Sequence, residues 1–136
     1  MKVKCKIYKL QDLEDASASE RLSKYLGGAD GEIDLEVGDI YTVYGVEFWE
    51  NNPWYYLCAD GVEYPKPYPN VFFEIVDKRL SKHWVLNSEV GRSGDTHTSL
   101  VIKEWAADRS FYERTIDGDK EALGLFNFSR KVMDME

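Results

Sequence analysis

The stretch Leu35-Glu36-Val37-Gly38-Asp39-Ile40-Tyr41-Thr42-Val43-Tyr44 decides the predicted fold of this chain. Apolar and acidic residues alternate from Ile33 to Val37, which is the period of a strand with one buried face. Gly38-Asp39 is typical of a turn, and the β-branched and aromatic residues of 40–44 favour a second strand. We therefore expect two short strands that begin an antiparallel sheet.

The same pattern of strands and turns continues to residue 77. Asn51-Asn52-Pro53 and Asp60-Gly61 each favour a turn between aromatic stretches. The segment from Tyr64 to Pro69 contains three prolines, which remove three backbone donors and exclude a central strand. Phe72 to Asp77 again has the composition of a strand. Short strands at this spacing predict a small, strongly bent antiparallel sheet or barrel over residues 33–76.

A short helix is predicted before this sheet. Ser17 and Glu20 match a capping box, in which each side chain satisfies a backbone N–H of the first turn. The apolar residues that follow share one helical face, and Gly27 suits the left-handed residue that closes a helix. We expect this helix over residues 17–26.

The last third of the chain predicts helices that cover the sheet. The polar residues from Glu89 to Thr98 favour a loop. An apolar stripe at helical spacing runs from Ile102 to Ile116, and Asp119 is placed to cap a final helix. We therefore expect an α+β protein in which residues 99–134 are mainly helical and residues 1–136 form a single domain.

Length and charge exclude several classes of protein. The chain has 136 residues, with 17 Lys and Arg against 25 Asp and Glu, and a formal net charge of −8. This acidic balance disfavours nucleic acid as the main partner, because binding its backbone requires clustered cations. No apolar run approaches the length of a membrane helix, and the basic N-terminus is not followed by the apolar stretch of a secretory signal. We expect a cytoplasmic protein with no membrane and no nucleic-acid partner.

The sequence contains few signatures of an enzyme. It contains neither a glycine-rich phosphate loop nor a Gly-x-Ser-x-Gly elbow. Four potential zinc ligands are scattered rather than closely paired, namely Cys5, Cys58, His83 and His97. We therefore expect reduced thiols, no metal and no cofactor. His97 lies two residues after Asp95 in a polar segment, where a solvated histidine is expected and a general base is the alternative.

The stretch from Leu35 to Val76 resembles a Src-homology-3-like small barrel. Three elements carry the resemblance: the acidic strand and turn Leu35–Ile40, the aromatic pair Trp54-Tyr55, and the segment Tyr68–Val76. Pro69 stands at the family's proline and Phe72 at its tyrosine. The resemblance implies a small barrel that recognises a proline-rich peptide. Phe72 lacks the hydroxyl that helps the family to bind such a peptide, and the predicted helix of residues 17–26 replaces a short acidic loop.

Aromatic residues are enriched between residues 41 and 76. Because successive strand residues point to opposite faces, some of these rings must lie outside a small barrel. They either pack under the helices of the last third or form an exposed surface with an acidic rim. An exposed surface of this kind suits a protein partner, and the carboxylates favour a basic one. The predicted binding residues are Trp49, Trp54, Tyr55, Glu47, Glu50, Pro69 and Phe72.

These features predict a function without naming a partner. In size and acidity the chain is similar in general character to the small immunity proteins of bacterial toxin systems. We expect a non-enzymatic protein-binding protein of the immunity type, which inhibits a basic toxin. One alternative is a small-barrel module that binds a peptide in an exposed groove lined by Trp54, Pro69 and Phe72. The other is a small enzyme that uses His97 and a nearby carboxylate in a deep pocket.

Overall fold

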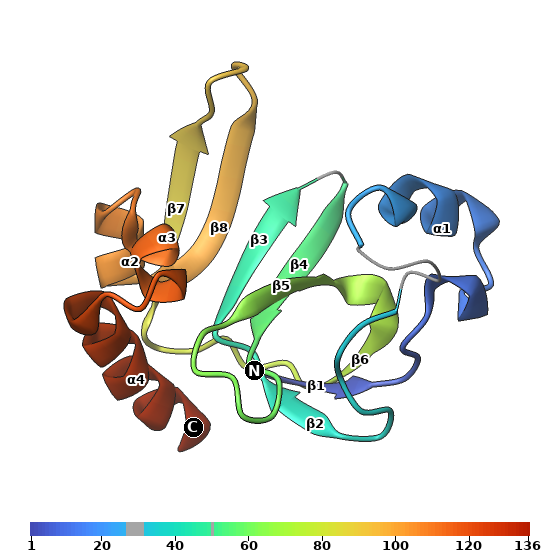
Figure 1. Cartoon of the computed structure of the whole chain (residues 1–136), viewed down its shortest axis with the longest axis horizontal. Helices are drawn as coiled ribbons and strands as arrows, with labels where there is room; N and C mark the ends of the chain where they lie inside the picture. The colour runs from blue at the N-terminus through green and yellow to red at the C-terminus, as the bar shows by residue number, and fades with distance from the viewer. Residues whose placement is uncertain (27–31, 50) are drawn as a thin grey trace.

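The computed structural model describes residues 1–26, 32–49 and 51–136 (Figure 1). Its strands form two antiparallel sheets. One α-helix lies near the start of the chain and the others follow the last strand, so the predicted α+β class is confirmed. The first sheet has the strand order β2-β1-β6, with β1 at Lys2–Cys5, β2 at Ile40–Thr42 and β6 at Phe73–Asp77. The second has the order β5-β4-β3-β8-β7, with β3 at Gly45–Trp49, β4 at Asn52–Leu57, β5 at Lys66–Pro69, β7 at Trp84–Val90 and β8 at Thr96–Ile102.

The helices flank these sheets. They are α1 (Ala16–Ser23), α2 (Lys103–Ala107), α3 (Phe111–Ile116) and α4 (Lys120–Asp134), with short 3-10 turns η1 (Leu10–Asp12) and η2 (Asn70–Phe72). In Figure 1, α1 lies near the β3–β4 end of the larger sheet, whereas α2, α3 and α4 gather on the other side, beside the β7–β8 hairpin. The hairpin extends away from the rest of the molecule.

The two sheets pack against each other around a common core. The chain passes from β2 to β3 through Val43 and Tyr44, and η2 joins β5 to β6. Tyr55 of β4 contacts Phe73 of β6, with 5.9 Å between the ring centroids. One buried cluster contains side chains of β1, β2, β4, α3 and α4. That shared cluster is compatible with the single domain predicted for residues 1–136.

The larger sheet is covered on both faces. Trp54, Tyr55 and Tyr56 are consecutive in β4, and all three are buried. Because neighbouring strand residues point to opposite faces, only Tyr55 points towards the first sheet. Trp54 packs beneath the segment that carries α1, in a cluster with Leu22. Tyr56 packs beneath α2, with its ring centroid 4.7 Å from that of Trp105.

Two predictions for the N-terminal half are wrong in detail. Asp15, not Ser17, caps α1, because its carboxylate accepts hydrogen bonds from the backbone N–H groups of Ser17 and Ala18. The predicted closing residue Gly27 lies outside the described residues. The alternating segment 33–37 is not a strand of either sheet. Side chains hold it instead, since Asp34 accepts hydrogen bonds from Lys66 and Tyr68 of β5.

The C-terminal third also differs from the prediction. The segment 89–98, predicted as a loop, belongs largely to the β7–β8 hairpin, whose pairs run from Trp84 and Ile102 to Val90 and Thr96. Its polar composition reflects strands that extend into solvent. The helical stripe is broken between α2 and α3, where the Asp108 carboxylate accepts a hydrogen bond from the N–H of Ser110. The predicted cap at Asp119 is confirmed, because its side chain accepts from the N–H of Ala122. The proline-rich segment forms β5 at a sheet edge, in agreement with the exclusion of a central strand there.

α4 closes the core through aromatic and polar contacts. Phe126 is buried and meets Tyr44 edge to face, with 5.6 Å between the ring centroids. The hydroxyl of Tyr44 donates a hydrogen bond of 2.6 Å to Asp134 near the end of the helix. α4 is therefore fixed to the β2–β3 connection at two points along its length.

We expect Phe126→Ala to lower the free energy of unfolding by about 3–5 kcal/mol, because it empties a buried site against Tyr44. Phe128→Ala is the matched control, since this ring on the same helix is 72% exposed and its loss should change stability by less than about 0.5 kcal/mol. Urea denaturation measures both variants. Equal losses of stability would contradict the packing of α4 described above.

Candidate binding surface

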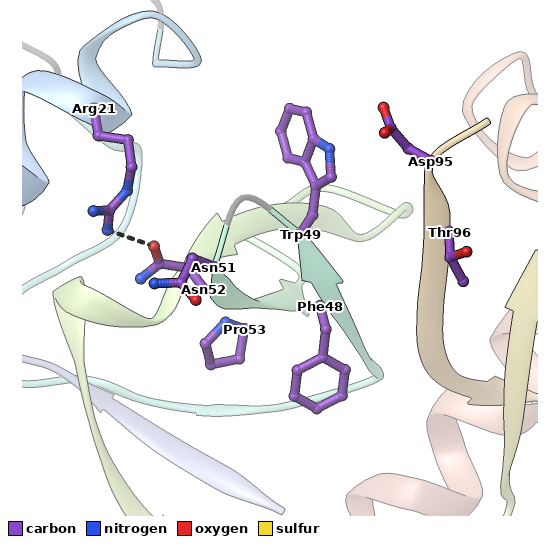
Figure 2. A pocket seen from close by; sticks show the side chains of 8 residues that line it. All are labelled: Arg21, Phe48, Trp49, Asn51, Asn52, Pro53, Asp95 and Thr96. Carbon is purple, nitrogen blue, oxygen red and sulfur yellow. Dashed lines mark hydrogen bonds between the residues drawn. The ribbon is translucent and has the colours of Figure 1, made fainter. Parts of the chain in front are cut away.

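A hollow of about 680 Å³ opens where β3 and β8 separate (Figure 2). These strands pair from Val46 to Phe48 on β3 and from Thr98 to Leu100 on β8. β8 stays paired with β7 as far as Thr96, beyond its last pair with β3. Side chains of α1, of the β3–β4 end and of the start of β8 line the hollow, namely Arg21, Phe48, Trp49, Asn51, Asn52, Pro53, Asp95 and Thr96.

Phe48 and Trp49 enter this hollow from opposite faces of β3, and Figure 2 shows their rings pointing in opposite directions. Phe48 is 47% exposed and lies on the face of its strand partner Pro53. Trp49 is half-buried, because its ring meets Tyr25 at 4.4 Å and Trp54 at 5.5 Å between centroids. Phe48 is therefore the more accessible aromatic side chain of the hollow.

A chain of hydrogen bonds fixes the wall formed by α1. Nη2 of Arg21 donates to the side-chain oxygen of Asn52 at 2.7 Å, and Nδ2 of Asn52 donates to Asn70 of η2 at 2.8 Å. Asn52 is buried, so these bonds are shielded from water. Among the described residues, Nε of Arg21 is buried without a hydrogen-bond partner. α1, β4 and η2 are therefore held together at the base of the hollow.

A second, smaller hollow of about 100 Å³ lies further along β3 and β8. Glu47 is at its centre, on the same face of β3 as Trp49. The hydroxyl of Tyr56 donates to Oε2 of Glu47 at 2.8 Å, and Nδ1 of His97 lies 3.5 Å from Oε1. Burial raises the pKa of Tyr56 well above its usual value, and the nearby Glu47 carboxylate raises it further. Tyr56 thus remains a donor that holds this carboxylate in place.

Further carboxylates surround the smaller hollow. Glu89 and Asp108 line it together with Arg109. Arg109 lies 4.0 Å from Glu89 and is largely exposed, so this ion pair contributes little to stability. Glu47 and Glu89 share the face of Trp49, opposite to Phe48, and Asp95 adds a carboxylate at the larger hollow, which Arg21 also lines.

The structure buries four of the predicted binding residues. Trp54, Tyr55, Pro69 and Phe72 are all buried. The prediction that Trp54, Pro69 and Phe72 line an exposed groove is therefore wrong. Its physical reason is the segment between β1 and β2, since Leu10 and Leu22 pack directly onto Trp54 and Phe72. A strand pattern alone does not reveal that a distant segment covers this face.

Two other predicted binding residues do reach the surface hollows. Trp49 lines the larger one and Glu47 the smaller. Glu50 lies outside the described residues. Phe48 is not among the binding residues predicted from the sequence. Strand alternation nevertheless places Phe48 and Trp49 on opposite faces of β3, so one of the two rings must point away from the face that carries Trp54.

The hollow that His97 lines is the smaller of the two. The enzyme alternative requires a deep pocket around His97, and the hollow that His97 lines holds about 100 Å³, below the roughly 300–1,000 Å³ of ordinary small-molecule sites. No group of three or more His, Cys, Asp or Glu side chains is placed to hold a metal ion in the described parts of the chain. Cys5 and Cys58 are unpaired and buried, and burial raises the pKa of Cys58 to about 11. Within the described residues, no helix has the length and apolar character needed to cross a membrane.

The burial of Trp54 leads to a prediction that separates core from surface. We expect Trp54→Ala to lower the free energy of unfolding by about 3–5 kcal/mol, because the indole is only 4% exposed and packs on Trp49 and Tyr25. Phe48→Ala, which removes a half-exposed ring of the same hairpin, should cost less than about 1 kcal/mol. Thermal and urea unfolding of both variants test this. A Trp54→Ala protein as stable as the parent would contradict the burial of Trp54 in the core.

Comparison of the chain with protein-family models, with curated proteins and with solved structures finds no match. The larger hollow has an accessible aromatic ring and a wall held by hydrogen bonds, and carboxylates line both hollows.

Proposed function

We propose that this chain is a non-enzymatic, cytoplasmic protein-binding protein that receives a basic partner at the surface between α1 and the β7–β8 hairpin. One observation carries the proposal: Phe48 is half-exposed at the wall of a hollow of about 680 Å³, beside half-buried Trp49. Aromatic side chains with rigid surroundings are typical anchors of protein interfaces, because burying them costs little conformational entropy.

Charge supports the choice of a basic partner. The chain carries a net charge of −8, and Glu47, Glu89 and Asp95 lie along the two hollows. Such a field attracts a cationic surface over several ångströms and accelerates its encounter with the hollow. An acidic protein of this size that covers a basic surface acts by steric blockage, so the proposed role is an immunity-type inhibitor of a basic toxin.

The resemblance to Src-homology-3-like barrels stays a proposal for the fold of residues 35–76. Two small antiparallel sheets that share a core support it. Peptide recognition by the residues that carry the resemblance has less support, because Trp54, Pro69 and Phe72 are covered by the chain itself. We therefore place the proposed partner at Phe48 rather than at those residues.

A small enzyme that uses His97 is the second candidate. Its support is the 3.5 Å contact between His97 and Glu47, in which a carboxylate can orient the imidazole as a general base. The small volume of this hollow ranks the enzyme below the binding protein. Phe48→Ala separates the two candidates, because it leaves His97 and Glu47 intact.

The binding proposal is tested by affinity capture from the native host, followed by titration of the captured protein. We expect Phe48→Ala to weaken its binding by about 2 kcal/mol, or about 30-fold, because the anchor ring is lost. Phe128→Ala, which removes an exposed ring on α4, is the control and should bind as the parent does. Equal affinity of the Phe48→Ala protein and the parent would contradict this placement of the partner.

Charge at the site gives a separate kinetic prediction. We expect added salt to slow association with the captured partner more than it changes dissociation, because rim charges act mainly on the encounter. Glu89→Gln should slow association in low salt, whereas Asp117→Asn, which removes one charge outside both hollows, should have a smaller effect. Stopped-flow or surface-plasmon measurements give both rate constants. An association rate that rises with salt would exclude a basic partner at this site.

A further inference from the structure

The two outer strands of the larger sheet differ in how they are protected. β5 carries Lys66, Pro67 and Pro69, and prolines with a lysine are common devices that stop an edge strand from pairing with another chain. β7, at the opposite edge, reads Trp84-Val85-Leu86-Asn87-Ser88-Glu89-Val90 and has no proline, glycine or lysine. A seven-residue edge without these devices is a template for a further strand.

The side chains of β7 make this edge apolar on one face. Leu86 and Val90 are four residues apart, so they share a face, and they are 72% and 62% exposed. The pairs of β7 with β8 and of β8 with β3 place them on the same face as Phe48. The opposite face of the sheet carries Tyr56, against which Trp105 of α2 packs. α2 therefore leaves the face of Leu86 uncovered, along the extended hairpin of Figure 1.

We propose that β7 pairs antiparallel with β7 of a second copy of this chain, about a twofold axis at Ser88. In this register Leu86 of each copy lies opposite Val90 of the other, which places the two exposed apolar residues in contact twice. Asn87 lies opposite Glu89, so each carboxylate meets an amide donor rather than a second carboxylate. The result is one continuous sheet of ten strands.

The sequence of β7 itself selects this partner and this register. Centring the axis on Asn87 would place the exposed Leu86 opposite Ser88 and Val85 opposite the charged Glu89, and its one apolar pair would join Val90 to the buried Trp84. With the axis on Ser88, the apolar Leu86 lies opposite the apolar Val90. Glu89, the only charged residue of the strand, lies opposite Asn87, which can donate a hydrogen bond to it. A strand that is complementary to its own antiparallel copy favours a second copy as the occupant over an unrelated strand.

Repulsion between the net charges of the two copies opposes this association, so the association should depend on salt in a characteristic way. Each copy carries a net charge of −8, and repulsion between the copies weakens as salt screens it. The self-association should therefore strengthen with added salt, whereas binding of the basic partner proposed above should weaken. The two surfaces can thus be distinguished in the same protein, and the dimer does not depend on the proposed function.

Sedimentation velocity of the full chain, from about 1 μM to about 1 mM, measures the association. We expect a monomer–dimer equilibrium whose dissociation constant Leu86→Lys raises at least about tenfold, because a lysine on an edge strand disfavours pairing. Leu80→Lys is the control: it makes the same change at an exposed position outside the strands and should leave the equilibrium unchanged. Circular dichroism verifies that both variants are folded. A parent chain that stays monomeric throughout, or a dimer that Leu86→Lys leaves intact, would overturn the proposal.

A cysteine at the axis tests the register independently. In the proposed pairing the two Ser88 residues lie directly opposite each other, at a spacing that suits a disulfide. Under mild oxidation Ser88→Cys should give a covalent dimer, whereas Ser93→Cys, in the turn of the same hairpin, should not. Cys5 and Cys58 are buried and do not interfere. Efficient cross-linking through position 93 in place of 88 would contradict the register.

Discussion

Three consecutive aromatic residues in β4 impose the constraint on which the rest of the structure depends. Trp54, Tyr55 and Tyr56 alternate between the faces of one strand, so burying all three requires cover on both faces. The first sheet covers Tyr55, the segment with α1 covers Trp54, and α2 with α3 covers Tyr56. Each burial removes a large ring from water and stabilises the fold by about 1.5–3 kcal/mol. The two helical segments therefore cover one face of the larger sheet, and the first sheet covers the other.

The candidate binding surface lies where these covers end. Past Phe48 the strands β3 and β8 separate, and neither α1 nor α2 extends over the gap between them. Phe48 lies on the face of β3 opposite to Trp54 and is half-exposed there, while the hydrogen bonds from Arg21 to Asn52 and on to η2 hold the adjoining wall. On the neighbouring part of the sheet, Glu47 keeps a fixed carboxylate through Tyr56. The half-exposed Phe48 and the fixed Glu47 carboxylate thus lie on opposite faces of β3, at the end of the strand that also borders the larger hollow.

The sequence predicts what depends on local chemistry and misses what depends on distant segments. The α+β class, the cap at Asp119 and the exclusion of the proline-rich segment from a central strand follow from short patterns, and the structure agrees with all three. The burial of Trp54 and Phe72 depends on a segment far away in the chain, which no spacing within the strands reveals. The outer part of the β7–β8 hairpin, within residues 89–98, resembles a loop in sequence because strands that extend into solvent have a polar composition. Strand alternation likewise places Phe48 and Trp49 on opposite faces but does not show which of the two rings stays exposed.

The proposed basic partner contacts the chain at Phe48, and site-specific photo-cross-linking from this position tests that placement. A photoreactive phenylalanine analogue at position 48 keeps the half-exposed ring, and the same analogue at position 128 serves as the reference, since both side chains are accessible. The account predicts a cross-link from position 48 to a basic segment of the captured partner, and none from position 128. Cross-linking from position 128 alone, or from position 48 to an acidic segment, would contradict it.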